Sequence, residues 1–167
     1  MGRALEIPSA IERLFQEGDR AHRRNLRIVH LLREFGLEAT DIIIPDLFSR
    51  RENGMLPFDS YANGFPLHLL ISLMTDFAQS RHELEFARML TWEQVLCHVN
   101  RAPRWHLLSA LKRVGTSESI VLLRELKGEI NKIPYAPYYQ IYQPDIDNEQ
   151  VGETIAVCEK RVFLQSA

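Results

Sequence analysis

Residues 19–58, DRAHRRNLRIVHLLREFGLEATDIIIPDLFSRRENGMLPF, decide how the rest of the chain is interpreted. The first part of this stretch is basic and holds no acidic residue between its five arginines: Arg20, Arg23, Arg24, Arg27 and Arg33. Gly36 then marks a turn, and a second amphipathic segment follows that ends in basic residues. This order of helix, tight turn and helix predicts a helix-turn-helix-like segment at about residues 20–51.

Two interpretations of this segment stay open. In the first it contacts DNA: arginines at three- and four-residue intervals form one basic stripe that neutralises phosphates, namely Arg20, Arg23, Arg24 and Arg27. At the far end, the residues expected to approach the DNA backbone or base edges are Ser49, Arg50 and Arg51. In the second interpretation, the segment is two ordinary packed helices whose arginines are solvated.

The side chains of the two helices predict which residues of the first helix face the core and where the second helix begins. The first is expected to turn a set of apolar residues and one histidine inward: Leu26, Val29, His30, Leu31 and Leu32. Gly36 supplies its left-handed cap. Pro45 stands inside the second helix, where proline is tolerated only in the first turn, so this helix is expected to begin late or irregularly.

The remaining sequence up to residue 132 has helical periodicity. A capping box at Ser9–Glu12 directly after Pro8 predicts that a first helix begins there. Further helical patterns follow from Pro66 onward, and the short loops between them predict antiparallel neighbours in one bundle. Hydrophobic content of 46% with 25% charged residues is ordinary for a soluble globular protein and indicates neither a disordered nor a fibrous class. We therefore expect a mainly α fold with a helical domain at residues 1–132.

From residue 133 the composition changes. Prolines and tyrosines cluster, and two runs favour extended structure, Tyr138–Tyr142 and Thr154–Phe163. These runs predict a small ribbon-like β-hairpin tail at residues 133–167. Tyr135, Tyr138, Cys158 and Arg161 are spaced as the ligands of a two-knuckle zinc ribbon would be. Because one thiolate cannot hold a structural zinc ion, we expect no metal and no cofactor.

No catalytic constellation is found. The sequence has no nucleotide-binding glycine loop, nucleophile elbow or zinc-binding helix, and its six histidines are scattered, so we expect a protein that is not an enzyme. The two cysteines are far apart, no apolar run is long enough to span a membrane, and the N-terminus has no apolar signal region. These features predict a cytoplasmic protein with no membrane association.

Three segments in order resemble the FlhC family, whose members pair with FlhD in flagellar master activators and have relatives on conjugative elements. They are the helix-turn-helix-like segment, the stretch Gly54–Phe58, which resembles the family's Gly-x-Leu-Pro-Phe-like linker, and the ribbon-spaced tail. The resemblance implies a DNA-binding subunit of a heteromeric activator that binds promoter DNA with an FlhD-like partner and recruits RNA polymerase. It also implies that this chain has lost the family's zinc site, since Tyr135, Tyr138 and Arg161 stand where the family has cysteines.

The formal net charge of −2 limits this expectation. A DNA-binding surface on such a chain must be a local patch, or be completed by a partner. The alternative function is a non-DNA helical adaptor or structural subunit, whose apolar faces dock another protein and whose arginines pair with an acidic partner.

Overall fold

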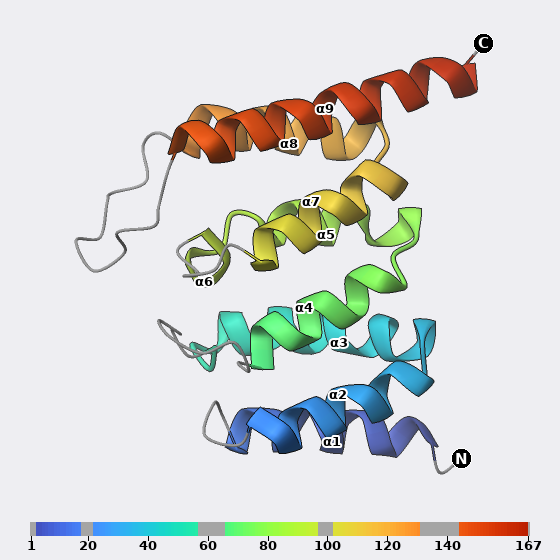
Figure 1. Cartoon of the computed structure of the whole chain (residues 1–167), viewed down its shortest axis with the longest axis vertical. Helices are drawn as coiled ribbons and strands as arrows, with labels where there is room; N and C mark the ends of the chain where they lie inside the picture. Colours follow the sequence, from blue (N-terminus) through green and yellow to red (C-terminus); the bar gives the residue numbers. More distant parts are fainter. Residues whose placement is uncertain (1–2, 18–21, 57–65, 97–101, 131–143, 167) are drawn as a thin grey trace. The chain divides into compact units, whose positions relative to one another are not determined.

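The computed structural model describes residues 3–17, 22–56, 66–96, 102–130 and 144–166 (Figure 1). Within these ranges the chain forms nine α-helices and one short 3-10 helix, and no strand occurs. The elements are α1 (Arg3–Glu17), α2 (His22–Glu34), α3 (Leu37–Glu52), α4 (Pro66–Asp76), η2 (Ser80–His82), α5 (Glu83–Met89), α6 (Glu93–Leu96), α7 (Ala102–Val114), α8 (Ser117–Ile130) and α9 (Pro144–Ser166). The predicted mainly α fold is confirmed for this part of the chain.

The chain divides into two compact units, Met1–Phe77 and Ala78–Ala167. The predicted domain boundary at residues 132 and 133 lies outside the described residues. In the first unit, α2 and α3 each pack against both α1 and α4. Apolar side chains from all four helices fill the centre, among them Ile11, Leu32, Leu47 and Leu70. Burial of these aliphatic groups provides most of the stabilisation of the unit.

Two prolines lie inside helices of the first unit, against expectation. α1 begins at Arg3 and runs through Pro8, because Ile7 is buried one turn before Ile11 and extends the apolar stripe. α3 begins directly after Gly36 and continues through Pro45, whose ring lies on the exposed side of the helix. The prediction that α1 starts at Ser9 was wrong. For α3, the alternative of a late start was also wrong, since the helix begins at Leu37. Burial of the flanking apolar residues outweighs the loss of one backbone donor at each proline.

In the second unit, α7 and α8 each pack against both α5 and α9. Glu83 of α5 is buried and accepts two hydrogen bonds from Thr116, one from the backbone nitrogen at 2.5 Å and one from Oγ1 at 2.7 Å. Thr116 stands directly before α8, and its Oγ1 accepts from the Glu118 nitrogen at 3.4 Å. Glu83 therefore ties α5 to the N-terminus of α8, where a negative charge is favoured by the helix dipole.

The predicted β-hairpin tail is wrong over its second half. Thr154–Phe163, expected as a strand, lies within the helix α9. Val151, Ile155 and Cys158 are buried at helical spacing against α7 and α8. The β-branched residues in this run had favoured a strand, but burial of one helical face determines the structure. Tyr138–Tyr142, the other expected strand, lies outside the described residues.

The two units repeat one arrangement of helices. The order α1, α2, α3, α4 in the first unit has the same packing pattern as α5, α7, α8, α9 in the second. In both units a glycine, Gly36 or Gly115, separates the second helix from the third, and a proline begins the fourth. At one constant sequence offset, buried residues coincide in pairs: Leu32 with Leu111, Thr40 with Ser119, and Leu47 with Leu126. Within the described residues, the two units therefore share one four-helix arrangement, to which the second unit adds η2 and α6.

Candidate functional site

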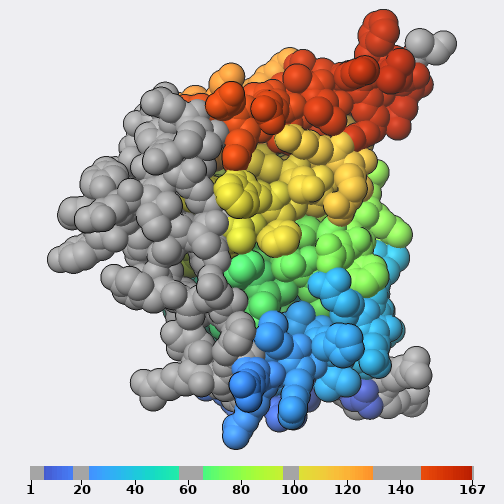
Figure 2. Space-filling model, viewed as in Figure 1, coloured from blue at the N-terminus to red at the C-terminus, as the bar shows by residue number. Residues whose placement is uncertain are grey.

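The basic stripe predicted from the sequence lies on α2. Arg23, Arg24 and Arg27 are exposed, and no ion pair involves them among the described residues. Figure 2 shows α2, in blue, at the surface of the molecule. Arg20, the first residue of the predicted stripe, lies outside the described residues. The described part of α2 therefore presents three guanidinium groups to solvent within about one and a half helical turns.

Arg33, at the other end of α2, has an internal partner. Its Nη1 donates to Asp76 Oδ2 of α4 at 2.5 Å, and both side chains are about half exposed. The pair joins α2 to α4 at the surface of the first unit. Surface pairs of this kind contribute little to stability, so Arg33 can exchange its partner at small cost.

Arg50 is placed inside the first unit rather than on its surface. It is 9% exposed, and its guanidinium donates to Glu12 Oε2 at 2.6 Å and to Asp46 Oδ2 at 2.7 Å. The same group stands 4.3 Å from the centroid of the Phe15 ring. Burial opposes the charge of Arg50, but the hydrogen bonds and charges of the two carboxylates outweigh it and raise the pKa of the guanidinium. Arg50 thus links α3 to α1.

Ser49 and Arg51, the other residues predicted at the end of α3, are exposed. The end of α3 and the beginning of α2 lie at the same end of the first unit, on the left in Figure 1. The structure therefore brings Ser49 and Arg51 to the end of the unit that also carries Arg23 and Arg24. The exposed side of α3 nearer its beginning has a different character, because Glu38 and Asp41 there are acidic.

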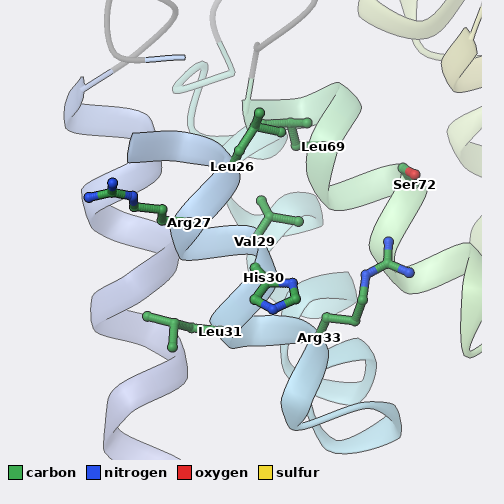
Figure 3. A pocket seen from close by; sticks show the side chains of 8 residues that line it. All are labelled: Leu26, Arg27, Val29, His30, Leu31, Arg33, Leu69 and Ser72. Atoms are coloured by element: carbon green, nitrogen blue, oxygen red, sulfur yellow. The ribbon is translucent and has the colours of Figure 1, made fainter. Parts of the chain in front are cut away.

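A groove of about 750 Å³ lies over the exposed side of α2 and against α4 (Figure 3). Its apolar lining comes from Leu26, Val29 and Leu31 of α2 and from Leu69 of α4. Arg33 projects toward α4 in this view, whereas Arg27 projects to the opposite side of α2. The expectation that Leu26 and Leu31 point inward was wrong, since they are 44% and 56% exposed. His30, also expected inward, is exposed at the edge of the groove.

The inward face of α2 instead contains Asn25, Ile28, Val29 and Leu32. On hydrophobicity alone, Leu26 and Leu31 were expected in the core rather than Asn25. In the structure, Asn25 is the residue that is fully buried. The position of Asn25 one turn before Val29 was the available signal, since residues four apart share a helix face. Because α2 is oriented with Asn25 in the core, Leu26 and Leu31 lie at the surface beside the arginines.

The second unit offers no comparable cluster among its described residues. Cys158 is fully buried, and its Sγ donates to the Leu111 carbonyl oxygen at 3.3 Å. Burial raises the pKa of this thiol, although the nearby charge of Arg161 opposes the shift. No group of three or more histidine, cysteine or acidic side chains that could hold a metal ion is found in the described ranges. Tyr135 and Tyr138, expected at positions of the resembled zinc ribbon, lie outside those ranges.

Comparison with protein-family models, with curated proteins and with solved structures finds no match. The resemblance to the FlhC family therefore stays a prediction from the sequence. Among the described residues, no helix is long and apolar enough to cross a membrane.

Proposed function

We propose that the protein is a DNA-contacting subunit of a heteromeric transcriptional activator, and that α2 binds the phosphate backbone. The observation that carries this proposal is the exposure of Arg23, Arg24 and Arg27 on one helix, with no ion pair to any described carboxylate. Guanidinium groups that are not neutralised inside the protein are available to phosphates, with which they form charge-assisted hydrogen bonds.

The proposed contact differs from that of a standard recognition helix. Such a helix places its N-terminal residues against base edges in the major groove. In α3 those positions hold exposed carboxylates, Glu38 and Asp41, which would be repelled by phosphates. We therefore assign backbone binding to α2 and a supporting contact to Ser49 and Arg51. Arg50 is left out of the contact set, because its guanidinium is held by Glu12 and Asp46.

Backbone contacts give affinity and orientation but carry no sequence information. With a net charge of −2 and one short basic stripe, the chain is expected to bind DNA weakly by itself. A second subunit would complete the surface and select the promoter site. In line with the sequence resemblance, we propose an FlhD-like partner for this role and RNA polymerase as the target of the assembled activator.

Charge reversal tests the proposal. The full chain, and the complex isolated with it from the native host, are titrated into a fluorescent DNA duplex of mixed sequence at low salt. The double variant Arg23→Glu with Arg24→Glu is expected to lower the affinity of the complex by about tenfold or more, because each reversal removes one phosphate contact and adds repulsion. The matched control, Arg88→Glu with Arg113→Glu on the exposed surface of the second unit, is expected to have little effect.

A second function is favoured by one observation, the apolar groove beside the arginines. A helical adaptor that binds no DNA would use Leu26 and Leu31 to dock another protein and the arginines to pair with its carboxylates. The same titration separates the two functions. No binding of the duplex at low salt, either by the chain or by its complex, would rule out the first function and favour the adaptor.

A further inference from the structure

Only one side of α9 packs against the second unit. Its buried residues lie at helical spacing on one face: Val151, Thr154, Ile155 and Cys158. In α4, which has the same place in the first unit, consecutive residues are buried on all sides of the helix: Leu69, Leu70 and Ile71, then Leu73, Met74 and Thr75. The outer side of α9 is therefore a helix face that the described residues of its own unit do not cover.

The C-terminal part of α9 carries large apolar side chains in solvent. Cys158 is the last buried residue among the described residues of α9, and beyond it Phe163 is 73% exposed and Leu164 is 64% exposed. In Figure 1 this part of α9 extends past the end of α8. Arg161 ties it to the unit, since Nη1 donates to the Gly115 carbonyl oxygen at 2.8 Å. Exposed apolar side chains on a projecting helix are typical of an interaction surface.

Five exposed residues of the outer side have the spacing of a helix-pairing surface, which we call the outer seam. They stand four, three, four and three residues apart: Glu149, Glu153, Ala156, Lys160 and Phe163. Intervals of three and four residues keep side chains in one line along a helix, as in helices that pair along their length. The outer seam can therefore lie against a second helix over about four turns.

The charges of the outer seam make it complementary to itself. Its acidic residues precede Ala156, and its lysine follows. A second α9 can lie antiparallel to the first, with the two Ala156 residues in contact. Lys160 of each copy then lies between Glu149 and Glu153 of the other, on both sides of a two-fold axis. A parallel pair would instead place like charges together, so the order of charges favours the antiparallel direction.

The charged groups at the two ends of the outer seam are available to a partner. Neither Glu149 nor Lys160 forms an ion pair with any described residue. Glu153 is paired with Lys112 at 3.2 Å, so we assign the contact to Glu149. At the centre, the small side chain of Ala156 allows two helix axes to approach closely. Phe163 of one copy then covers the turn that carries Glu149 in the other.

We propose that two copies of this chain form a homodimer through an antiparallel pair of α9 helices, centred on Ala156 and joined by two Glu149–Lys160 ion pairs. A second copy is the occupant that the charges specify, because the outer seam is complementary to its own reversed sequence. The inference goes beyond the proposed function and does not rest on DNA binding. A dimer of this kind would carry two copies of the basic stripe of α2, as dimeric proteins that bind paired half-sites do.

Two single charge reversals test the proposal on the full chain. Sedimentation equilibrium measures the dimer dissociation constant of the natural chain, of Lys160→Glu and of Glu149→Lys. The natural chain is expected to dimerise, and each reversal is expected to weaken the dimer by about tenfold, because symmetry turns two attractive pairs into two repulsive ones. An equimolar mixture of the two variants is expected to recover the natural affinity as a heterodimer, since opposite charges again face each other at both ends.

Arg88→Glu is the matched control. Arg88 is exposed on α5, and its reversal changes the net charge as much as Lys160→Glu does, so dimer affinity is expected to stay unchanged. Circular dichroism checks that each variant is folded. A natural chain that is monomeric at every concentration, or a dimer that Lys160→Glu does not weaken, would overturn the proposal. So would a mixture that associates no better than its components, or an equal loss of affinity in Arg88→Glu.

A disulfide at the centre of the outer seam tests the geometry directly. Facing residues of two closely packed helices come within the distance that a disulfide spans, so Ala156→Cys is expected to form a covalent dimer when an oxidant is added. Val121→Cys, exposed on α8, is the control and is expected to stay monomeric on the same denaturing gel. The natural chain, in which Cys158 is buried, gives the background. A non-covalent dimer that Ala156→Cys fails to cross-link would show that the copies meet at another surface.

Discussion

The guanidinium of Arg50 donates to Glu12 Oε2 at 2.6 Å and thereby joins α3 to α1. The same group also donates to Asp46 on its own helix and lies over the ring of Phe15, so three neighbours hold one buried charge. Buried arginines of this kind stabilise a fold only while their partners are present. Arg50 is buried and holds α3 against α1, whereas the next residue, Arg51, is exposed to solvent.

Replacement of Arg50 by alanine is expected to destabilise the first unit by about 2 kcal/mol, through loss of charge-assisted hydrogen bonds and of the cation–π contact. The neighbouring variant Arg51→Ala serves as the control, since Arg51 is exposed, and is expected to change stability by less than about 0.5 kcal/mol. Urea unfolding followed by circular dichroism measures both values. Equal stability of the two variants would show that the Arg50 contacts are not needed.

Glu12 makes the stability of the first unit depend on pH. The hydrogen bond from Arg50, its charge, and a hydrogen bond from Gln16 together lower the pKa of the Glu12 carboxyl below its ordinary value. A carboxyl with a lowered pKa in the folded state stabilises the fold above its unfolded pKa, and this contribution is lost as pH falls through the folded value. Glu12→Gln is therefore expected to be less stable than the natural chain at neutral pH, with the difference disappearing in acid.

A double-mutant cycle provides the control for this pH effect. In an Arg50→Met background, Glu12 has lost the partner that lowers its pKa most and keeps only the exposed hydrogen bond from Gln16, so Glu12→Gln is expected to have little effect at any pH. Thermal unfolding is measured from neutral pH to well below the ordinary pKa of a glutamate carboxyl, about 4.3. A stability difference between the natural chain and Glu12→Gln that persisted in acid would mean that the carboxylate charge is not its source.

The helices around Gly36 could be predicted from the sequence, because local signals agreed there. Gly36 has a φ of 56°, in the region that favours glycine, and helical periodicity continues on both sides of it. The orientation of α2 could not be predicted in the same way. Its inward face is set by contact with α1 and α4, which accept buried Asn25 and leave Leu26 in solvent. Hydrophobicity alone therefore assigned the wrong residues to the core and missed the groove.

The repeat was also missed, for a physical reason. The second and third helices of the two units share few identical residues, although Gly36 and Gly115 occupy equivalent turns. What they share is burial at matched positions, which different apolar residues satisfy equally well. A comparison of hydrophobic positions at the offset between these two glycines could have revealed it. The same comparison would have assigned residues 145–155 to a helix, because they correspond to α4.

The turn before α8 is tightly packed, so Gly115→Ala is expected to destabilise the second unit. A Cβ at Gly115 would lie 2.7 Å from the Leu111 carbonyl oxygen and 2.8 Å from Cys158 Sγ, both closer than packed atoms normally approach. Overpacking of this kind costs about 1 to 3 kcal/mol. Chemical denaturation of the variant measures the loss of stability.

Gly128→Ala is the matched control, because it lies in α8 and its Cβ would meet nothing within 4 Å. This variant is expected to stabilise the helix by up to about 1 kcal/mol, the difference in helix propensity between glycine and alanine. If Gly115→Ala were as stable as Gly128→Ala, the contacts of this turn with Leu111 and Cys158 would not limit the size of residue 115.

If α2 binds DNA, the dependence of affinity on salt concentration is expected to report how many phosphates its arginines contact. If Arg23 contacts one phosphate, Arg23→Ala is expected to lower the slope of log affinity against log salt by about 0.9, the value for one neutralised phosphate of duplex DNA. The equivalent change at Arg88, exposed on α5, is expected to leave the slope unchanged. The decisive quantity is the slope rather than the affinity, because a variant that merely unfolds in part loses affinity equally at every salt concentration. A slope for Arg23→Ala equal to that of the natural complex would remove α2 from the DNA contact.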